Sequence, residues 1–192
     1  MNINELVSDF ITAQKIDTII TYKKITPERT LIIVEPPSDE KYTCFDDLVN
    51  LPVYVFWKKE GRFFLTKINY CYEYSIITLE NNTFWTIYFS NKKTIDNEKV
   101  EPFEYFAIEK SKKKKYAVGM SNSTFQKLSV IINGDKTEKL FDNFDLQKES
   151  EGLININYKS NNSLQSKKII DILEKITSEA EKNNTFKQIK SR

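Results

Sequence analysis

The stretch VYVFWKKEGRFFLTKIN, residues 53–69, predicts a β-hairpin. Apolar and aromatic side chains fill Val53–Lys58 and Arg62–Asn69, a composition typical of strands. The polar turn Lys59-Glu60-Gly61 separates the two runs, and Gly61 can adopt the positive φ that a tight hairpin turn requires. The centre of the chain is therefore expected to be antiparallel sheet.

Two more runs of the same kind extend this pattern. Tyr72–Leu79 and Thr83–Ser90 are rich in aromatic and β-branched residues and follow short polar breaks. Four adjacent runs joined by short turns predict an antiparallel β-meander over residues 51–90. In the first run apolar side chains occupy both alternating sets of positions, so the sheet is expected to be covered on both faces or curled into a small barrel.

Helices are predicted on both sides of this meander. Residues 3–15 and Ser166–Lys182 each carry apolar side chains at helical spacing, which gives one apolar stripe per helix. The stripes are formed by Ile3, Leu6, Val7, Phe10 and Ile11 in the first helix, and by Ile169, Ile170, Leu173, Ile176 and Ala180 in the second. The fold class is thus α+β: an antiparallel β-meander or small barrel with flanking N- and C-terminal helices.

The remaining segments give weaker signals. Residues 125–132 fit a strand or a helix equally well, and residues 133–152 are charged and resemble a loop. Further strands are expected at residues 17–23, 29–35, 103–109, 114–120 and 153–158.

The chain is expected to divide near its C-terminus. Residues 1–158 form a single α+β domain, residues 159–165 are a polar linker, and residues 166–192 are a helix and tail. A helix behind a flexible linker need not pack on its own domain. Its apolar stripe is therefore a candidate protein interface, anchored by Ile170, Leu173 and Phe186.

The chain contains no histidine among its 192 residues. This excludes Ser-His-Asp and Cys-His catalysis and most zinc sites. The four glycines are too few and too scattered for a P-loop, a dinucleotide-binding loop or a G-x-S-x-G elbow. No catalytic residue, metal ligand or cofactor is predicted, and a binding role is favoured over catalysis. A metal-dependent nuclease remains as an alternative, and Asp39-Glu40-Lys41 is its sole acid-x-Lys tripeptide.

The densest charge cluster is a candidate nucleic-acid contact. It consists of Lys110, Lys112, Lys113, Lys114 and Lys115. Lysines contact phosphates, and aromatic side chains of the predicted sheet could stack bases, so a single-stranded nucleic-acid-binding module is one alternative function. Arginine forks for base readout are scarce, since the only arginines are Arg29, Arg62 and Arg192.

Charge and hydropathy limit the other partners. The net charge of +2 provides no global field that attracts nucleic acid or an anionic membrane, and no apolar run approaches the length of a membrane span. Met1–Lys15 lacks the basic and apolar regions of a signal peptide, so the protein is expected in the cytoplasm or in a virion and not as a secreted protein. Cys44 and Cys71 could pair with each other, but two cysteines without a motif spacing are more often buried thiols, which is the expectation here.

These observations favour a non-enzymatic assembly subunit that forms homo- or hetero-oligomers with other protein subunits. The abundance of Lys, Asn, Ile, Phe and Tyr over Gly, Ala, Arg and Pro is typical of AT-rich genomes, bacteriophage genomes among them. The most specific version of this expectation is a bacteriophage virion component such as a head–tail connector or ring protein.

Overall fold

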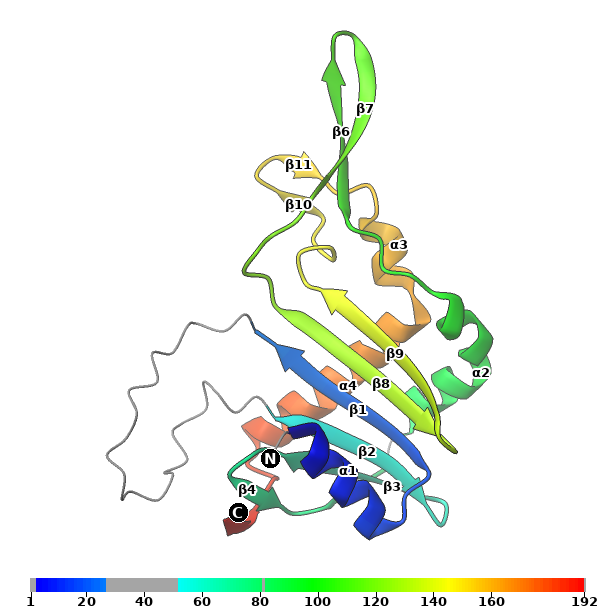
Figure 1. Ribbon diagram of the computed structural model, residues 1–192, viewed down its shortest axis with the longest axis vertical. Coiled ribbons are helices and arrows are strands. Elements are labelled where there is room, and N and C mark those ends of the chain that lie inside the picture. Colours follow the sequence, from blue (N-terminus) through cyan, green and yellow to red (C-terminus); the bar gives the residue numbers. More distant parts are fainter. Residues whose placement is uncertain (1–2, 27–51, 81, 192) are drawn as a thin grey trace, which may run out of the picture.

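The computed structural model describes residues 3–26, 52–80 and 82–191, and its centre is an eight-stranded antiparallel sheet (Figure 1). The strand order is β12-β4-β3-β2-β1-β8-β9, and β5 also pairs with β3. The elements are α1 (Ile3–Gln14), β1 (Thr18–Ile25), β2 (Val53–Lys59), β3 (Arg62–Ile68), β4 (Tyr72–Tyr74), β5 (Ile77–Leu79), α2 (Thr83–Asn97), β6 (Phe103–Glu109), β7 (Lys112–Val118), β8 (Phe125–Ile132), β9 (Asp135–Asp142), β10 (Glu149–Ser150), β11 (Leu153–Ile154), α3 (Tyr158–Ser163), α4 (Gln165–Lys182) and β12 (Gln188–Ser191).

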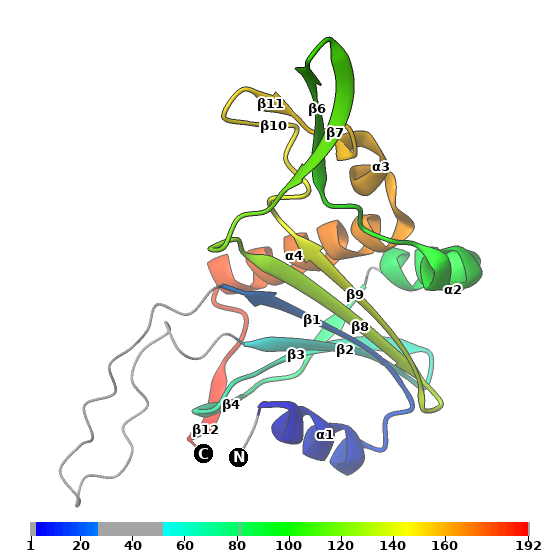
Figure 2. The ribbon, with the colours of Figure 1, turned by 45° about the horizontal axis from the view of Figure 1, so that its top comes forward.

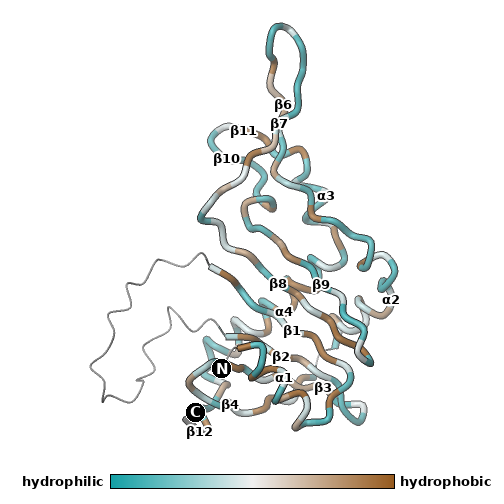
Figure 3. Tube along the Cα trace, viewed as in Figure 1, coloured by the Kyte–Doolittle hydropathy of each residue, from teal (hydrophilic) through white to brown (hydrophobic). Residues whose placement is uncertain are grey.

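This architecture confirms the α+β class with helices at both ends. Helix α1 covers one face of the large sheet, and α2 and α4 lie on the other (Figure 2). Hydrophobic residues are frequent in the central strands, as Figure 3 shows, because α2 and α4 cover one of their faces and α1 covers part of the other. The sheet is not a closed barrel, since its end strands β9 and β12 are not paired with each other in the described chain.

The β2–β3 hairpin forms as predicted. Val55 pairs with Thr66 and Phe56 with Leu65, and Glu60 and Gly61 take the positive φ values of 51° and 76° at the turn. The odd residues of β2 pack under α1, and Phe56 packs with α2 and α4 on the opposite face. Strand alternation therefore supplies both layers of the core.

The fourth predicted strand is wrong, because Thr83–Ser90 belongs to helix α2. Phe84, Trp85 and Tyr88 are all buried, which fits one face of a helix and not a strand whose neighbouring side chains point to opposite faces. Aromatic composition favours strands, and here tertiary packing overrides that preference. The run Tyr72–Leu79 is divided as well, into the short strands β4 and β5.

The region expected to be a loop contains the edge strand β9. It follows β8 through a tight turn at Asn133 and Gly134, whose φ values are 51° and 91°. Within β9 only Phe141 is buried, and charged residues occupy most of the other positions. Because so few of its residues are apolar, the hydrophobic pattern of the sequence did not predict this strand. Only residues 153–154 of the strand expected at 153–158 are extended.

The predicted linker is also helical. Residues 158–163 form α3, in which Asn161 is 1% exposed and donates from Nδ2 to the carbonyl oxygens of Glu101 and Asp145. Helix α4 then packs across the sheet, and its N-terminal amides at Gln165 and Ser166 donate to the Glu98 carboxylate at 2.6 and 3.0 Å. The segment therefore holds α4 firmly on the domain.

Several predicted features lie outside the described residues: the strand at 29–35, the tripeptide Asp39-Glu40-Lys41 and Cys44. Cys71 is buried and disulfide-bonded, so the expected free thiol at this position is wrong. None of the described helices combines the length and the apolar character needed to cross a membrane.

Candidate functional site

The predicted lysine cluster lies on a hairpin that projects from the body of the protein. Strands β6 and β7 pair with each other along seven residue pairs and with no other strand in the described chain (Figures 1 and 2). Lys110 and Ser111 form the turn, with φ values of 48° and 65°. A two-stranded ribbon is only marginally stable by itself, so its base must be held by the body.

The base of this hairpin is fixed by packing and hydrogen bonds. Phe103 is fully buried and stacks on Phe144 with ring centroids 4.9 Å apart. The backbone amide of Ile156 donates to the carbonyl oxygen of Glu104 at 2.8 Å, and Asn157 Nδ2 donates to the Glu104 carboxylate at 2.9 Å. The hairpin is therefore an anchored arm and not a loose loop.

The outer part of the hairpin exposes apolar surface. Ile108 is 83% exposed, Phe106 47% and Tyr116 37%. Side chains of this size are rarely exposed together on one small element unless they meet a partner.

Most of the lysines on this hairpin already have partners. Lys114 pairs with Glu109, Lys115 pairs with Glu104 at 3.0 Å, and the Lys113 ammonium lies 3.9 Å from the centroid of the Phe106 ring. Within the described chain Lys110 and Lys112 form no ion pair. The cluster thus offers fewer free charges to phosphate than the sequence indicated.

The other predicted site residues lie in the core of their own domain. Ile170 and Leu173 are 0% exposed and Phe186 is 8% exposed, all within the main core cluster. The expectation that they anchor a second chain is therefore corrected, because no partner can reach them in this conformation. The apolar stripe of α4 was identified correctly, but α3 holds the helix so that this stripe packs in the core of its own chain.

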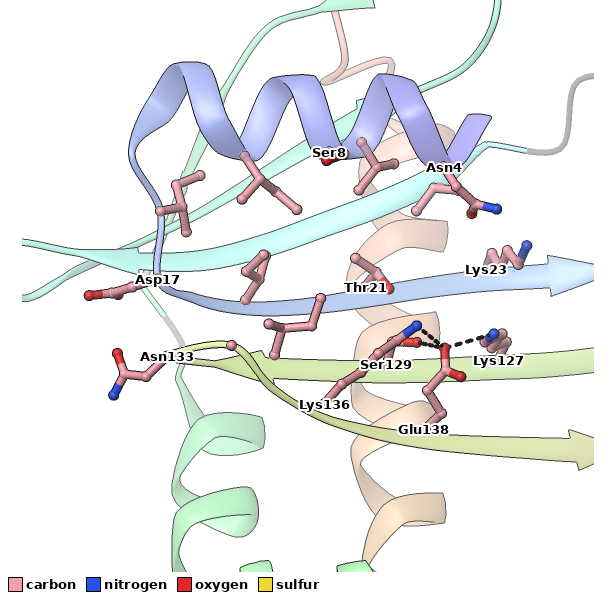
Figure 4. Close-up of a pocket in the computed structure, with 17 residues that line it drawn as sticks. Asn4, Ser8, Asp17, Thr21, Lys23, Lys127, Ser129, Asn133, Lys136 and Glu138 are labelled. Atoms are coloured by element: carbon pink, nitrogen blue, oxygen red, sulfur yellow. Dashed lines mark hydrogen bonds and ion pairs between the residues drawn. The ribbon is translucent and has the colours of Figure 1, made fainter. Parts of the chain in front are cut away.

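A groove of about 700 Å³ runs between α1 and the uncovered half of the large sheet (Figure 4). We call it the α1 groove. Its apolar part is lined by α1 and by neighbouring positions of the sheet, and its polar part is a floor built by β1, β8 and β9. The apolar side comprises Val7, Ile11, Ile16, Ile19, Val53 and Ile131; the floor comprises Thr21, Lys23, Lys127, Ser129, Lys136 and Glu138.

Glu138 organises this floor. Its Oε1 atom lies 2.8 Å from Lys127 Nζ and 2.9 Å from Lys136 Nζ, and it accepts a hydrogen bond of 2.7 Å from Ser129 Oγ. These interactions lower the pKa of Glu138 from 4.5 to about 2, with the bond from Lys127 the largest cause. Two of the three groove lysines, Lys127 and Lys136, are therefore ion-paired with the same carboxylate.

Lys23 is the uncommitted cation of the α1 groove. It is half-buried, it stands opposite Lys127 in the β1–β8 register, and it has no hydrogen bond or ion pair among the described residues. Burial is the largest cause that lowers its pKa, followed by the charge of Lys127. Thr21 lies two residues before Lys23 on the same face of β1, and its hydroxyl likewise forms no hydrogen bond with the described residues. The floor therefore has free donors.

Replacing Glu138 is expected to change acid stability. Its folded-state pKa is depressed, so its contribution is fully present above about pH 4.5 and is lost as the pH falls toward 2. Urea unfolding midpoints should be lower for Glu138→Gln than for the wild type at pH 6. The difference should shrink steadily below pH 4.5 and disappear only as the pH falls below 2. A difference that stays constant from pH 6 to pH 2 would contradict this account.

The sequence carried a signal for the α1 groove that pattern analysis did not use. Lys127 and Ser129 interrupt the apolar strand β8 at a spacing of two, and Thr21 and Lys23 do the same in β1. Polar residues at alternate positions of two paired strands share one sheet face. The missing part was β9, whose residues were assigned to a loop.

The described residues contain no group of three or more histidine, cysteine, aspartate or glutamate side chains that could hold a metal ion. No protein-family model, curated protein or solved structure matches this chain.

Proposed function

We propose that this protein is a non-enzymatic assembly subunit whose β6–β7 hairpin docks on an acidic surface of another protein. The observation that carries the proposal is an anchored, projecting arm with Ile108 83% exposed near its end. Burying such a side chain in a partner stabilises a complex by about 1.5–3 kcal/mol.

The charge of the arm specifies the partner. Residues 103–118 contain five lysines and two glutamates, a net charge of +3. A second identical arm would be repelled, whereas an acidic surface would meet Lys110 and Lys112 around the apolar contact. This charge disfavours pairing of two arms, and we propose that the partner is a different protein.

Single-stranded nucleic acid is the less favoured occupant. Ile108, the most exposed apolar side chain, has no π-face on which a base could stack. Tyr105 and Tyr116 stack on each other with centroids 5.8 Å apart, and two of the lysines are neutralised by glutamates. The bacteriophage connector or ring predicted from composition is one kind of assembly in which such an arm would serve.

Site-specific photocrosslinking tests the docking of the arm. A photoreactive phenylalanine analogue replaces Ile108 in the full chain, and the matched control carries it at Leu140, a strand residue of the body that is 51% exposed. In lysate of the source cells we expect one dominant product from position 108, linked to an acidic peptide, and no such product from position 140. The isolated partner should bind the wild type and Leu140→Asp equally, and Ile108→Asp at least about tenfold more weakly.

Three results would contradict the proposal. Equal products from both positions, or none from position 108, would show that the arm does not dock. Sub-micromolar binding of oligo(dT), lost when Lys110 and Lys112 become alanine, would favour the nucleic-acid module. A dimer detected by light scattering and abolished by Ile108→Asp would make the partner a second copy of this chain.

A further inference from the structure

We infer that the α1 groove is a binding site for a small organic monoanion, a carboxylate with a hydrophobic body. This site is separate from the β6–β7 hairpin and does not depend on the proposed docking. The inference rests on the free donors of its floor, on the apolar side chains that line the groove beside them, and on its size.

The floor presents one free positive charge. Lys127 and Lys136 share Glu138, while Lys23 and the Thr21 hydroxyl have no partner among the described residues. An unpaired, half-buried ammonium is costly, and an incoming carboxylate would relieve that cost by pairing with it. The same argument predicts one ligand charge and not two, because Glu138 repels further negative charge.

The apolar side selects what is attached to the carboxylate. Val7 and Ile11 from α1 and Ile19 and Ile131 from the sheet line the groove beside the polar floor. A hydrocarbon chain or an aromatic ring placed there leaves water and contacts these side chains. The volume of about 700 Å³ lies within the range of small-molecule sites, roughly 300–1,000 Å³, and is larger than a simple ion needs.

Charge and a hydrophobic body together distinguish this ligand class from related small molecules. A short carboxylate such as acetate has the charge and lacks the body. Decanol has the body and lacks the charge, and decylamine carries the wrong sign. Decanoate has both features and is the probe of choice.

Titration of the ¹⁵N-labelled full chain with decanoate, below its micelle concentration, tests the site. We expect saturable amide shifts confined to α1 and to the groove-lining parts of β1, β2, β8 and β9. The affinity should rise up to about fourfold per methylene from butyrate to decanoate. Decanol should bind at least about tenfold more weakly, since it lacks the charge that Lys23 pairs with. Acetate and decylamine should give no saturable shifts.

Two variants assign the charge. Lys23→Gln should weaken decanoate binding about tenfold or more. The matched control is Lys24→Gln, which makes the same change on the next residue, whose ammonium faces the opposite side of the sheet and pairs with Glu174 at 2.5 Å. It should bind decanoate as the wild type does.

The inference is overturned if decanoate produces no saturable shifts, or shifts outside the groove. Equal binding of decanoate and decanol by the wild type would overturn it as well, and this comparison stands even if a variant fails to fold. Equal affinities of Lys23→Gln and the wild type would also refute it.

Discussion

A chain that lacks residues 163–192 is expected to lose cooperative folding. The deletion removes Ile169, Ile170, Leu173 and Phe186 from the main core cluster. Each such side chain contributes about 1.5–3 kcal/mol when buried, so the sum approaches the 5–15 kcal/mol that stabilises a typical domain. Circular dichroism during urea titration should show a broad, non-cooperative change, whereas the full chain should unfold in one transition.

Point variants show whether the truncated chain is destabilised because core side chains are lost or because the chain is shorter. Leu173→Ala should lower the free energy of unfolding by about 2–5 kcal/mol, because Leu173 is fully buried. Lys175→Ala, on the exposed side of the same helix, should change it by less than about 0.5 kcal/mol. If the truncated chain instead unfolds cooperatively with the stability of the full chain, α4 is not part of the core and the packing described above is wrong.

Truncating Phe84 in helix α2 is expected to have the second largest effect. Phe84 is 0% exposed and meets the Phe56 ring edge-on at 5.4 Å. Phe84→Ala should lower the free energy of unfolding by about 3–5 kcal/mol through lost burial and the cavity that remains. Chemical denaturation at constant pH measures this difference.

The same helix supplies the control. Phe89 is 52% exposed and stacks on Trp85 at 5.8 Å, so Phe89→Ala should cost about 1 kcal/mol or less. Similar losses at the two positions would mean that the buried face of α2 has been assigned incorrectly.

The contrast between α2 and the β2–β3 hairpin shows which elements of the fold can be predicted from the sequence. In the hairpin a glycine turn and alternating side chains agree with the final structure, so the register follows from local chemistry. In α2, aromatic residues favour a strand locally, and the helix is selected by the apolar surface of the sheet beneath it. Strand β9 was not predicted because its sequence is mostly charged. An edge strand needs few apolar side chains, so it lacks the pattern by which strands are recognised.

The candidate sites show the same division. The lysine cluster could be located from the sequence because its residues are adjacent, and its hairpin was largely predictable. Its ion pairs with Glu104 and Glu109 depend on cross-strand register, which the sequence did not define. The α1 groove combines one helix with four strands, two of which, β1 and β8, pair residues as distant as Thr18 and Ile132. No local pattern reveals such a site.

The charges on β9 have a consequence for self-association. An edge strand with unpaired backbone groups is a template on which another chain can add a strand, the first step toward ordered aggregates. Asp135, Lys136, Glu138 and Lys139 would each have to meet a charge of the right sign on an incoming strand. Continuous growth of the sheet through this edge is therefore disfavoured, and the protein should stay dispersed at concentrations where an apolar edge of the same length would nucleate fibrils.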